Sequence, residues 1–426
     1  MKRKKITALF LAVVTCILAL AANVSAADTE KGIALNKSSI TMVLGGTYTL
    51  KPTIKGLGKS TIQWSSSDKS VATVAKGGVV TAKKAGTAKI TVKVKDTNYS
   101  AVCTVKVRLP KKPSELVKGM GAGWTFYNSL DVTGADWISD IEDYETAWGH
   151  PKVTEKQIKA LQDAGFNTFR ISVCWNDHMS SDGTISAEWL DRVQEVVDYA
   201  YNRNMYVILT TNDGWISIKN EKAIREKYTK MWSQIAERFK EYDQRLIYEG
   251  LSLTNYCIDE NESGSFPVSG RKSLNNLYAD FVKTVRSAGK NNEKRFLIVT
   301  PADSYAALEI PDDDKILVGI PNLAPSQLSD GNSAGKKFDK NAKQDIVNSF
   351  NEIKKSFIDK GYNVVITQWG LADKSNDSER VKAAEYFVKT ADKNNIPCIW
   401  AEWIDELLDR KTLKWSSPEL TKAIVD

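Results

Sequence analysis

The sequence is poor in the residues that metal and redox sites need. Among its 426 residues there are only two histidines, His150 and His178, and neither has a partner at the spacing of a metal-binding motif. The five cysteines lie far apart, so no pair of them matches a zinc or dithiol motif. We therefore expect neither a metal ion nor a cofactor.

Long hydrophobic runs are missing after the N-terminus. There, four basic residues at positions 2–5 precede an apolar run from Ile6 to Ala22, and the small side chains of Val24 and Ala26 have the spacing that signal peptidase prefers. The run is shorter than the roughly 20 residues that span a bilayer comfortably, which argues against an uncleaved anchor. Residues 1–26 are therefore predicted to be a signal peptide of a secreted, extracellular protein that can stay associated with the cell surface, with no membrane span after cleavage.

A large excess of one charge is also missing. The formal net charge is +7, and four of these charges lie in the predicted signal peptide, which leaves +3. Such a surplus is too small to argue for nucleic acid or a membrane surface as a partner, and we expect a monomer. Four cysteines remain, Cys103, Cys174, Cys257 and Cys398, and the sequence leaves a disulfide among them open.

Residues 30–108 are rich in Thr, Val, Ser and Lys, alternate polar with apolar residues, and contain many glycines. This pattern is typical of short antiparallel strands in a β-sandwich. Trp64 lies on a central strand and is expected to fill the core. The amino-acid sequence at 62–66, 71–74, 78–81 and 85–92 resembles that of the group 2 bacterial immunoglobulin-like family. The resemblance implies a spacer or adhesive role at cell surfaces.

A short linker, residues 109–115 with Pro110 and Pro113, is predicted to separate this module from a second domain, residues 116–426. In the second domain strand-like apolar runs alternate with amphipathic helical stretches, which predicts a (β/α)8 barrel whose site lies at the C-terminal ends of the strands. The expected strands are 119–124, 167–173, 205–210, 246–251, 296–300, 316–320, 363–368 and 396–403. The expected helices include 187–203, 221–242, 274–288, 342–360 and 379–394.

Aromatic and polar residues cluster where these strands end. Indoles stack on pyranose faces while amides and carboxylates bond hydroxyl groups, so the mixture indicates carbohydrate binding. The candidate ligand-binding residues are Trp124, Asn128, Arg170, Trp175, Asn212, Asp213, Trp215, Asn322, Gln368, Trp369, Trp400, Glu402 and Trp403.

The whole second domain resembles glycoside hydrolase family five, and in particular its subfamily four endoglucanases and xyloglucanases. The resemblance is carried by four tracts, GFNTFRISVCW at 165–175, WSQIAERFKEYDQRLIYEG at 232–250, FVKTVRSAGKNNEKR at 281–295 and DRKTLKW at 409–415. It implies a barrel with a retaining pair of catalytic glutamates, one ending strand four and one ending strand seven.

Both glutamates are replaced in this chain. Strand four is followed by Ser252, Leu253 and Thr254 where the family has Asn-Glu-Pro, and strand seven ends in Thr-Gln-Trp-Gly, with Gln368 at the nucleophile position. Thr211-Asn212 replaces the family's paired histidine, Pro-Asn-Leu at 321–323 replaces its His-x-Tyr, and Ala401 replaces a tryptophan. Of the usual active-site residues Arg170 survives.

Retaining hydrolysis needs two carboxyl groups about 5 to 5.5 Å apart. Leu253 can neither attack nor protonate, and Gln368 has no ionisable oxygen, while the loss of general acid catalysis alone typically costs on the order of 10² to 10⁴ in rate. We therefore expect no catalytic residues and a barrel that binds a plant or microbial polysaccharide, β-glucan or xyloglucan, without cleaving it.

Two other hypotheses stay open. The first is an active endo-glycosidase of the cellulase class with a relocated carboxylate pair, which an inverting mechanism would place roughly 6.5 to 9.5 Å apart. Its candidate acids are Asp213, Asp259, Glu260, Asp303, Glu402 and Asp405. The second is a structural cell-surface scaffold or adhesin, in which Trp215, Trp369 and Trp403 would be buried.

Overall fold

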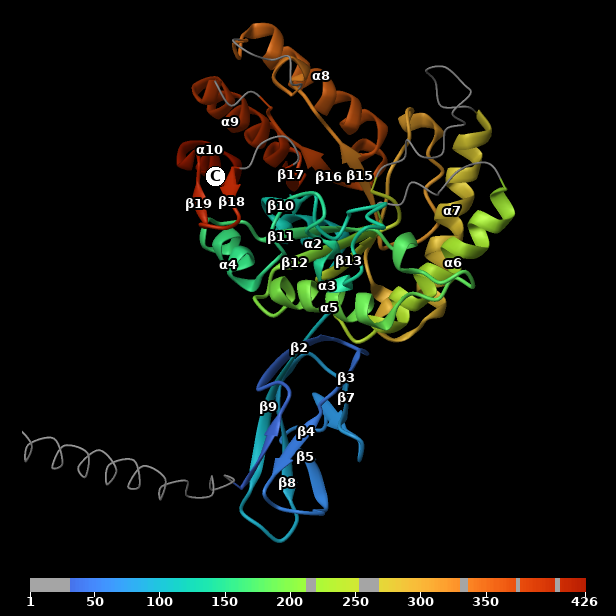
Figure 1. Ribbon diagram of the computed structural model, residues 1–426, viewed down its shortest axis with the longest axis vertical. Helices are drawn as coiled ribbons and strands as arrows, with labels where there is room; N and C mark the ends of the chain where they lie inside the picture. Colours follow the sequence, from blue (N-terminus) through green and yellow to red (C-terminus); the bar gives the residue numbers. More distant parts are fainter. Residues whose placement is uncertain (1–30, 212–219, 253–267, 330–335, 373–375, 403–406) are drawn as a thin grey trace, which may run out of the picture. The chain divides into compact units, whose positions relative to one another are not determined.

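The computed structural model describes residues 31–211, 220–252, 268–329, 336–372, 376–402 and 407–426. Two compact units meet at the boundary between Arg108 and Leu109, and each is described by itself. In Figure 1 the first unit runs from blue to cyan and the second from cyan to red.

The first unit is an all-β module. Its strands are β1 (Gly32–Leu35), β2 (Ser39–Val43), β3 (Thr47–Thr49), β4 (Pro52–Lys55), β5 (Ile62–Ser66), β6 (Ala72–Val74), β7 (Val79–Ala82), β8 (Gly86–Val94) and β9 (Ser100–Arg108). They form a four-stranded sheet in the order β2-β9-β8-β5, a three-stranded sheet β3-β7-β6 and a pair β1-β4. Buried side chains such as Leu50, Ile90 and Val105 form its core, and Trp64 packs partly buried against them, so the expected β-sandwich is confirmed.

The second unit is a closed barrel of eight parallel strands in sequence order. The strands are β10 (Gly123–Phe126), β11 (Thr168–Val173), β12 (Tyr206–Thr211), β13 (Leu246–Glu249), β14 (Leu297–Val299), β15 (Ile316–Pro321), β16 (Asn363–Trp369) and β17 (Cys398–Glu402). The outer helices include α3 (Ile141–Tyr144), α4 (Glu155–Asp163), α5 (Ala187–Tyr201), α6 (Glu221–Arg238), α7 (Val268–Ser287), α8 (Lys340–Ser356), α9 (Asp377–Lys393) and α10 (Pro418–Val425). A hairpin of β18 (Leu408–Asp409) and β19 (Lys414–Trp415) precedes α10. The predicted (β/α)8 barrel is therefore confirmed, and seven of its eight strands lie close to their predicted positions.

One difference concerns the predicted linker. Helix α2 (Pro113–Met120) begins within it, because Pro113 occupies the first turn, where a missing N–H costs nothing. Leu116, Val117 and Met120 of α2 are buried in one cluster with inward strand residues of the barrel. The helix thus belongs to the barrel, and residues 119 and 120, which we expected in the first strand, lie in it.

The interior and exterior of the barrel wall alternate along each strand, as they do in any barrel. Val365 of β16 lies in the inner cluster with Ile208 and Ile399, whereas Val364 and Ile366 lie in the larger cluster between strands and helices. Toward the carboxyl ends of the strands the barrel interior becomes polar. This polar layer contains the buried residues Thr125, Arg170, Thr210 and Glu249.

No described helix is long and apolar enough to cross a membrane. The three described cysteines, Cys103, Cys174 and Cys398, carry buried free thiols, and Cys257 lies outside the described residues.

Candidate functional site

A β-bulge on β16 sets the orientation of Gln368. The register against β17 shifts between Ile366 and Trp369, so this stretch holds one residue more than its neighbour. A bulge re-aims side chains in this way at functional ends of strands. Gln368 reaches the segment that follows β13, a strand that does not pair with β16, and its Nε2 donates a hydrogen bond to the backbone oxygen of Ser252 at 3.2 Å. Trp369 then points outward and stacks on Phe387 of α9, with ring centroids 4.4 Å apart.

An ion pair occupies the centre of the polar layer. Arg170 of β11 donates to both carboxylate oxygens of Glu249 of β13, from Nε at 2.7 Å and from Nη2 at 3.1 Å, and both side chains are fully buried. Burial raises the pKa of Glu249 and Arg170 opposes that rise. Burial by itself would lower the pKa of Arg170, but Glu249 outweighs it and the pKa is raised. The pair therefore holds its charges inside the barrel by mutual compensation.

The same arginine connects the ion pair to the glutamine. Nη2 of Arg170 also donates to Oγ of Ser252 at 3.0 Å. Ser252 thus accepts a hydrogen bond from Arg170 at its Oγ and one from Gln368 at its backbone oxygen. The Oγ atoms of Ser172 and Ser252 lie 3.4 Å apart. Leu253, the next residue, lies outside the described residues. At the end of β16 the chain therefore presents a carboxamide that donates a hydrogen bond, where an ionised carboxylate could only accept one.

Tyr127 borders this layer just after β10. Burial of its hydroxyl raises its pKa to about 12, and the charge of Arg170 opposes that rise. The layer thus contains a neutral phenol, a buried ion pair and a carboxamide. Its carboxylate, Glu249, is fully buried and bound by Arg170, so it is not available to act as a nucleophile.

Most of the predicted ligand-binding residues are placed differently from our expectation. Trp124, Trp175, Trp369 and Trp400 are at most 1% exposed, so the prediction that their indoles stack on sugars is wrong. Trp124 and Trp400 point to the outer side of the barrel wall, where Trp124 packs against Phe166 and Trp400 against Trp369. An indole enclosed by its own core has no face left for a ligand.

Arg170 and Asn322 are likewise committed to the protein. Arg170 has no exposed surface. Asn322 is 6% exposed and its amide donates to Oγ of Ser349 at 2.7 Å and accepts from the backbone of Ala324 at 3.0 Å. Both therefore organise the barrel, and the expectation that they contact a ligand directly is not met in this structure. Asn128, in contrast, is only partly buried, and its Nδ2 lies 3.2 Å from Nε2 of His150.

Four predicted contacts, Asn212, Asp213, Trp215 and Trp403, lie outside the described residues. So do four of the acids proposed for a relocated pair, namely Asp213, Asp259, Glu260 and Asp405. Of the other two, Asp303 is held by Arg271 through two hydrogen bonds of 3.0 and 2.6 Å, and Glu402 is 8% exposed and accepts from the backbone of Leu408 at 3.0 Å. The hydrogen bond from Arg271 lowers the pKa of Asp303, which makes it a poor proton donor.

Two exposed indoles were missed by the sequence reasoning. Trp137 is 67% exposed and Trp148 is 43% exposed. Both lie in the segment between β10 and α4, which is anchored at the carboxyl ends of strands: His150 contacts Asn128 after β10, and the hydroxyl of Tyr144 donates to Asp177 after β11 at 2.7 Å. The signal in the sequence is the long segment after the first barrel strand, which carries two tryptophans, whereas the prediction rested on residues directly at strand ends.

His178 and Asp131 are buried titratable groups beneath that segment. The ring of His178 stacks on Trp189 at 3.7 Å and meets the edge of Tyr144 at 4.4 Å, and burial lowers its pKa to about 4. Burial raises the pKa of Asp131 to about 6, although the backbone N–H of Ser129 donates to it at 2.8 Å. Both are less than 10% exposed, so they support the fold of the segment and are not available to a ligand.

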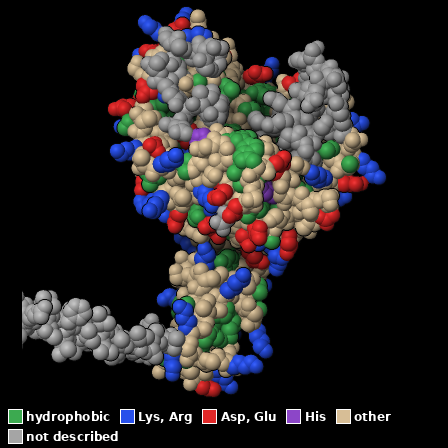
Figure 2. All heavy atoms as spheres, viewed as in Figure 1, with side chains coloured by type: hydrophobic (Ala, Val, Ile, Leu, Met, Phe, Trp, Pro, Cys, Tyr) green, Lys and Arg blue, Asp and Glu red, His purple; other side chains and the backbone are tan. Residues whose placement is uncertain are grey.

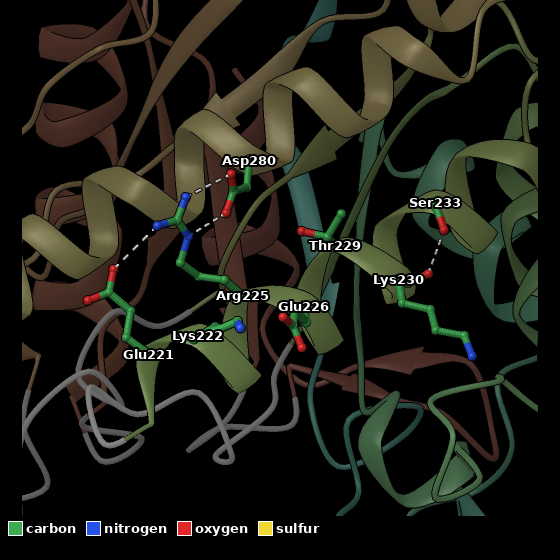
Figure 3. Close-up of a pocket in the computed structure, with 8 residues that line it drawn as sticks. All are labelled: Glu221, Lys222, Arg225, Glu226, Thr229, Lys230, Ser233 and Asp280. Atoms are coloured by element: carbon green, nitrogen blue, oxygen red, sulfur yellow. Dashed lines mark hydrogen bonds and ion pairs between the residues drawn. The ribbon is translucent and has the colours of Figure 1, made fainter.

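A hollow on the outside of the barrel has a different character (Figure 3). It is lined by residues of α6 together with Asp280 of α7, and its central Arg225 forms two hydrogen bonds of 2.6 and 3.1 Å with Asp280. None of the lining residues is aromatic or belongs to a barrel strand. We interpret it as the paired-charge seam between two helices.

The fold and the strand-end site define a barrel protein of the glycoside-hydrolase class joined to an immunoglobulin-like module. The profile of the cellulase family, glycosyl hydrolase family 5, matches residues 130–406, and that of the bacterial Ig-like domain, group 2, matches residues 31–105. The chain therefore belongs to glycosyl hydrolase family 5, and its relatives place it in subfamily 4, as the sequence resemblance predicted.

Endoglucanases of known structure or sequence are similar to this chain over the barrel. Endoglucanase A of Ruminococcus albus is 34% identical over 337 residues, which are 73% of this chain and 92% of that protein. A broad specificity GH5-4 endoglucanase from Clostridium acetobutylicum is 34% identical with a TM-score of 0.68, covering 74% of this chain and 100% of that one. A xyloglucan-specific GH5 endo-β-1,4-glucanase from a metagenomic library, solved with cellotriose, is 33% identical with a TM-score of 0.67, covering 73% and 97%.

Proposed function

We propose that this protein is secreted and that its barrel binds a β-glucan-type polysaccharide without hydrolysing it. The observation that carries the proposal is Gln368, a carboxamide at the end of β16 whose amide group donates to the Ser252 backbone. A carboxylate at that place would face a carbonyl oxygen with no proton to share, so the surroundings suit an amide. Leu253, at the other catalytic position, has no acidic proton in any conformation.

The ligand class is taken from the relatives, which are named endoglucanases and a xyloglucan-specific endo-β-1,4-glucanase. In this chain the exposed indoles of Trp137 and Trp148 are suited to stack on pyranose rings, whereas Trp124, Trp175, Trp369 and Trp400, the predicted strand-end indoles that the structure describes, are buried. Asn128 lies next to His150, is only partly buried and can bond sugar hydroxyl groups.

Native gels that contain barley β-glucan or xyloglucan test binding, and a reducing-end assay on the same polymers tests cleavage. We expect retardation of the full chain with no reducing ends above a protein-free blank. Replacement of Trp137 and Trp148 by alanine should weaken retardation by about ten-fold, because each stacking contact contributes about 0.5–1.5 kcal/mol. Tyr362→Ala is the matched control, since Tyr362 is 38% exposed and precedes β16, at the opposite end of the barrel.

The outcomes separate the alternatives. Reducing ends released at the speed of a cellulase, and abolished by Asp213→Asn or Asp259→Asn, would establish a relocated catalytic pair. Absence of retardation by every polysaccharide would instead favour the structural scaffold, for which the complete burial of Trp369 is the specific observation.

A further inference from the structure

The low net charge of the chain conceals a separation of charge between its two units. Residues 31–108 contain 14 Lys and Arg against 2 Asp and no Glu, a net charge of +12, whereas residues 109–426 contain 41 Lys and Arg against 48 Asp and Glu, a net charge of −7. The change of sign falls at the boundary between the units. Figure 2 shows Lys and Arg side chains on the visible surface of the immunoglobulin-like module. Repulsion among like charges destabilises a small fold, and a bound polymer of opposite charge would relieve it.

Four of these cations share the outer face of the four-stranded sheet. On β8, Lys89 and Lys93 are exposed between buried neighbours, and on β9, Lys106 and Arg108 are exposed on either side of the buried Val107. Residue pairing places Lys89 opposite Thr104, Lys106 opposite Thr87 and Lys93 opposite Ser100, so all four side chains leave the sheet on the same side. We call these four residues the basic face.

The positive charges of the basic face are not neutralised by acidic side chains among the described residues. None of its four side chains forms an ion pair or a hydrogen bond there, and the two acids of the module lie in turns. Asp68 is occupied by the backbone and hydroxyl of Ser70 at 2.8 and 2.6 Å, and Asp96 lies in the turn between β8 and β9. The charges are therefore available to a partner.

The surroundings of the cations indicate the chemistry of that partner. Most of the outward residues between them carry hydroxyl or amide groups, among them Thr41 and Gln63, which pair with Lys106 and Lys93. Val102, which is 45% exposed and pairs with Thr91, is the apolar exception on β9. No outward position of this sheet is aromatic, which disfavours nucleic acid, whose single strands are held by base stacking. Three of the four cations are lysines, point charges that need no fixed bidentate geometry.

We propose that the basic face binds an acidic polysaccharide whose charged groups are carboxylates. Such a polymer carries both the anionic groups that the lysines attract and the hydroxyl groups that the Thr, Ser and Gln side chains bond. From Lys93 to Arg108 the face extends over eight residue positions, or about 27 Å at 3.4 Å per residue, which is long enough for several sugar units. The inference concerns a module separate from the barrel, and it holds whether or not the barrel binds a glucan.

The test uses the full chain and soluble polygalacturonate as the probe. We expect binding at 50 mM salt that weakens about 50-fold at 200 mM, because four cation contacts to a flexible polyanion give a logarithmic salt slope of about 0.7 each. The triple variant Lys89→Glu, Lys93→Glu, Lys106→Glu should lose at least about ten-fold in affinity and most of the salt slope. Its binding of barley β-glucan through the barrel should equal that of the parent.

The matched control is Lys55→Glu, Lys69→Glu, Lys76→Glu, which changes the net charge equally at exposed positions outside the four-stranded sheet. This control should bind polygalacturonate more tightly than the triple variant of the basic face does, although both have the same net charge. Equal losses in both variants would overturn the basic face as the site. Tighter binding of polyphosphate or single-stranded DNA than of polygalacturonate, or undiminished binding of fully methyl-esterified polygalacturonate, would overturn the carboxylate polymer as the ligand.

Discussion

Replacing Gln368 by glutamate provides a direct probe of how far the site has adapted to an amide. The Nε2 donor to the Ser252 oxygen, 3.2 Å away, would be lost, which costs about 1 kcal/mol for a net hydrogen bond. Gln368 is 6% exposed, so the introduced carboxylate would also be poorly solvated. Arg170 directs Nε and Nη2 to Glu249, which limits what it can offer a second carboxylate.

The introduced carboxyl group should therefore have a pKa one to two units above the usual value of about 4.3, equivalent to about 1.4–2.7 kcal/mol. Because its folded pKa is raised, the penalty is absent below pH 4, where the protonated carboxyl can donate to Ser252 as the amide does. It grows as the pH rises through the folded pKa. We expect Gln368→Glu to cost about 2–4 kcal/mol at pH 8 and less than about 1 kcal/mol at pH 4.

Urea unfolding of the barrel, followed by tryptophan fluorescence at pH 4 and pH 8, measures this difference. The matched control is Gln344→Glu on the exposed surface of α8, which should change stability by less than about 0.5 kcal/mol at either pH. A Gln368→Glu variant as stable as the parent at pH 8, or one whose penalty grows on acidification, would refute the interpretation of the site. The variant should also release no reducing ends from β-glucan, since Leu253 still lacks an acidic proton.

Three further predictions concern the barrel. His178→Phe should remove an acid sensitivity of about 3 kcal/mol, because the lowered pKa of His178 makes the free energy of unfolding fall as the pH drops from 6.5 to 4. Asp131 has a raised pKa and an effect of opposite sign, but it is present in both proteins and cancels in the comparison with the parent. This is measured by urea unfolding at pH 7 and 4.5, and an unchanged pH dependence would contradict it. Arg170→Leu alone should cost about 3–5 kcal/mol, and adding Glu249→Leu should recover part of it; a double-mutant cycle without coupling would argue against the ion pair. Gly319→Ala should cost about 1–3 kcal/mol in thermal melts, since a Cβ would lie 2.6 Å from the side chain of Ile298, and an unchanged melting temperature would show that the neighbours move aside.

The barrel strands were predictable because parallel strands are buried on both faces and form continuous apolar runs. Stretches such as 205–210 and 363–368 therefore stand out from the amphipathic helices around them, and the structure places β12 and β16 there. The first strand was misplaced because Gly119 and Met120 end a helix that closes the bottom of the barrel, a tertiary role that local pattern does not encode.

The site was harder to predict because a one-residue change decides on which side of the barrel wall a side chain lies. The β-bulge at the end of β16 directs Gln368 to Ser252 and Trp369 to Phe387, and no residue type in the sequence marks the bulge. The sequence predicts a substitution at the nucleophile position, and that stays a prediction. Clustering at strand ends could not distinguish an indole of the core from one exposed to solvent.

The separation of charge between the two units has a practical consequence for handling the protein. With +12 on one module and −7 on the other, the whole-chain isoelectric point of about 8.8 describes neither. At neutral pH the molecule should be retained on cation-exchange resin by its sandwich and on anion-exchange resin by its barrel. Limited proteolysis between the units should divide it into two fragments that elute from opposite columns.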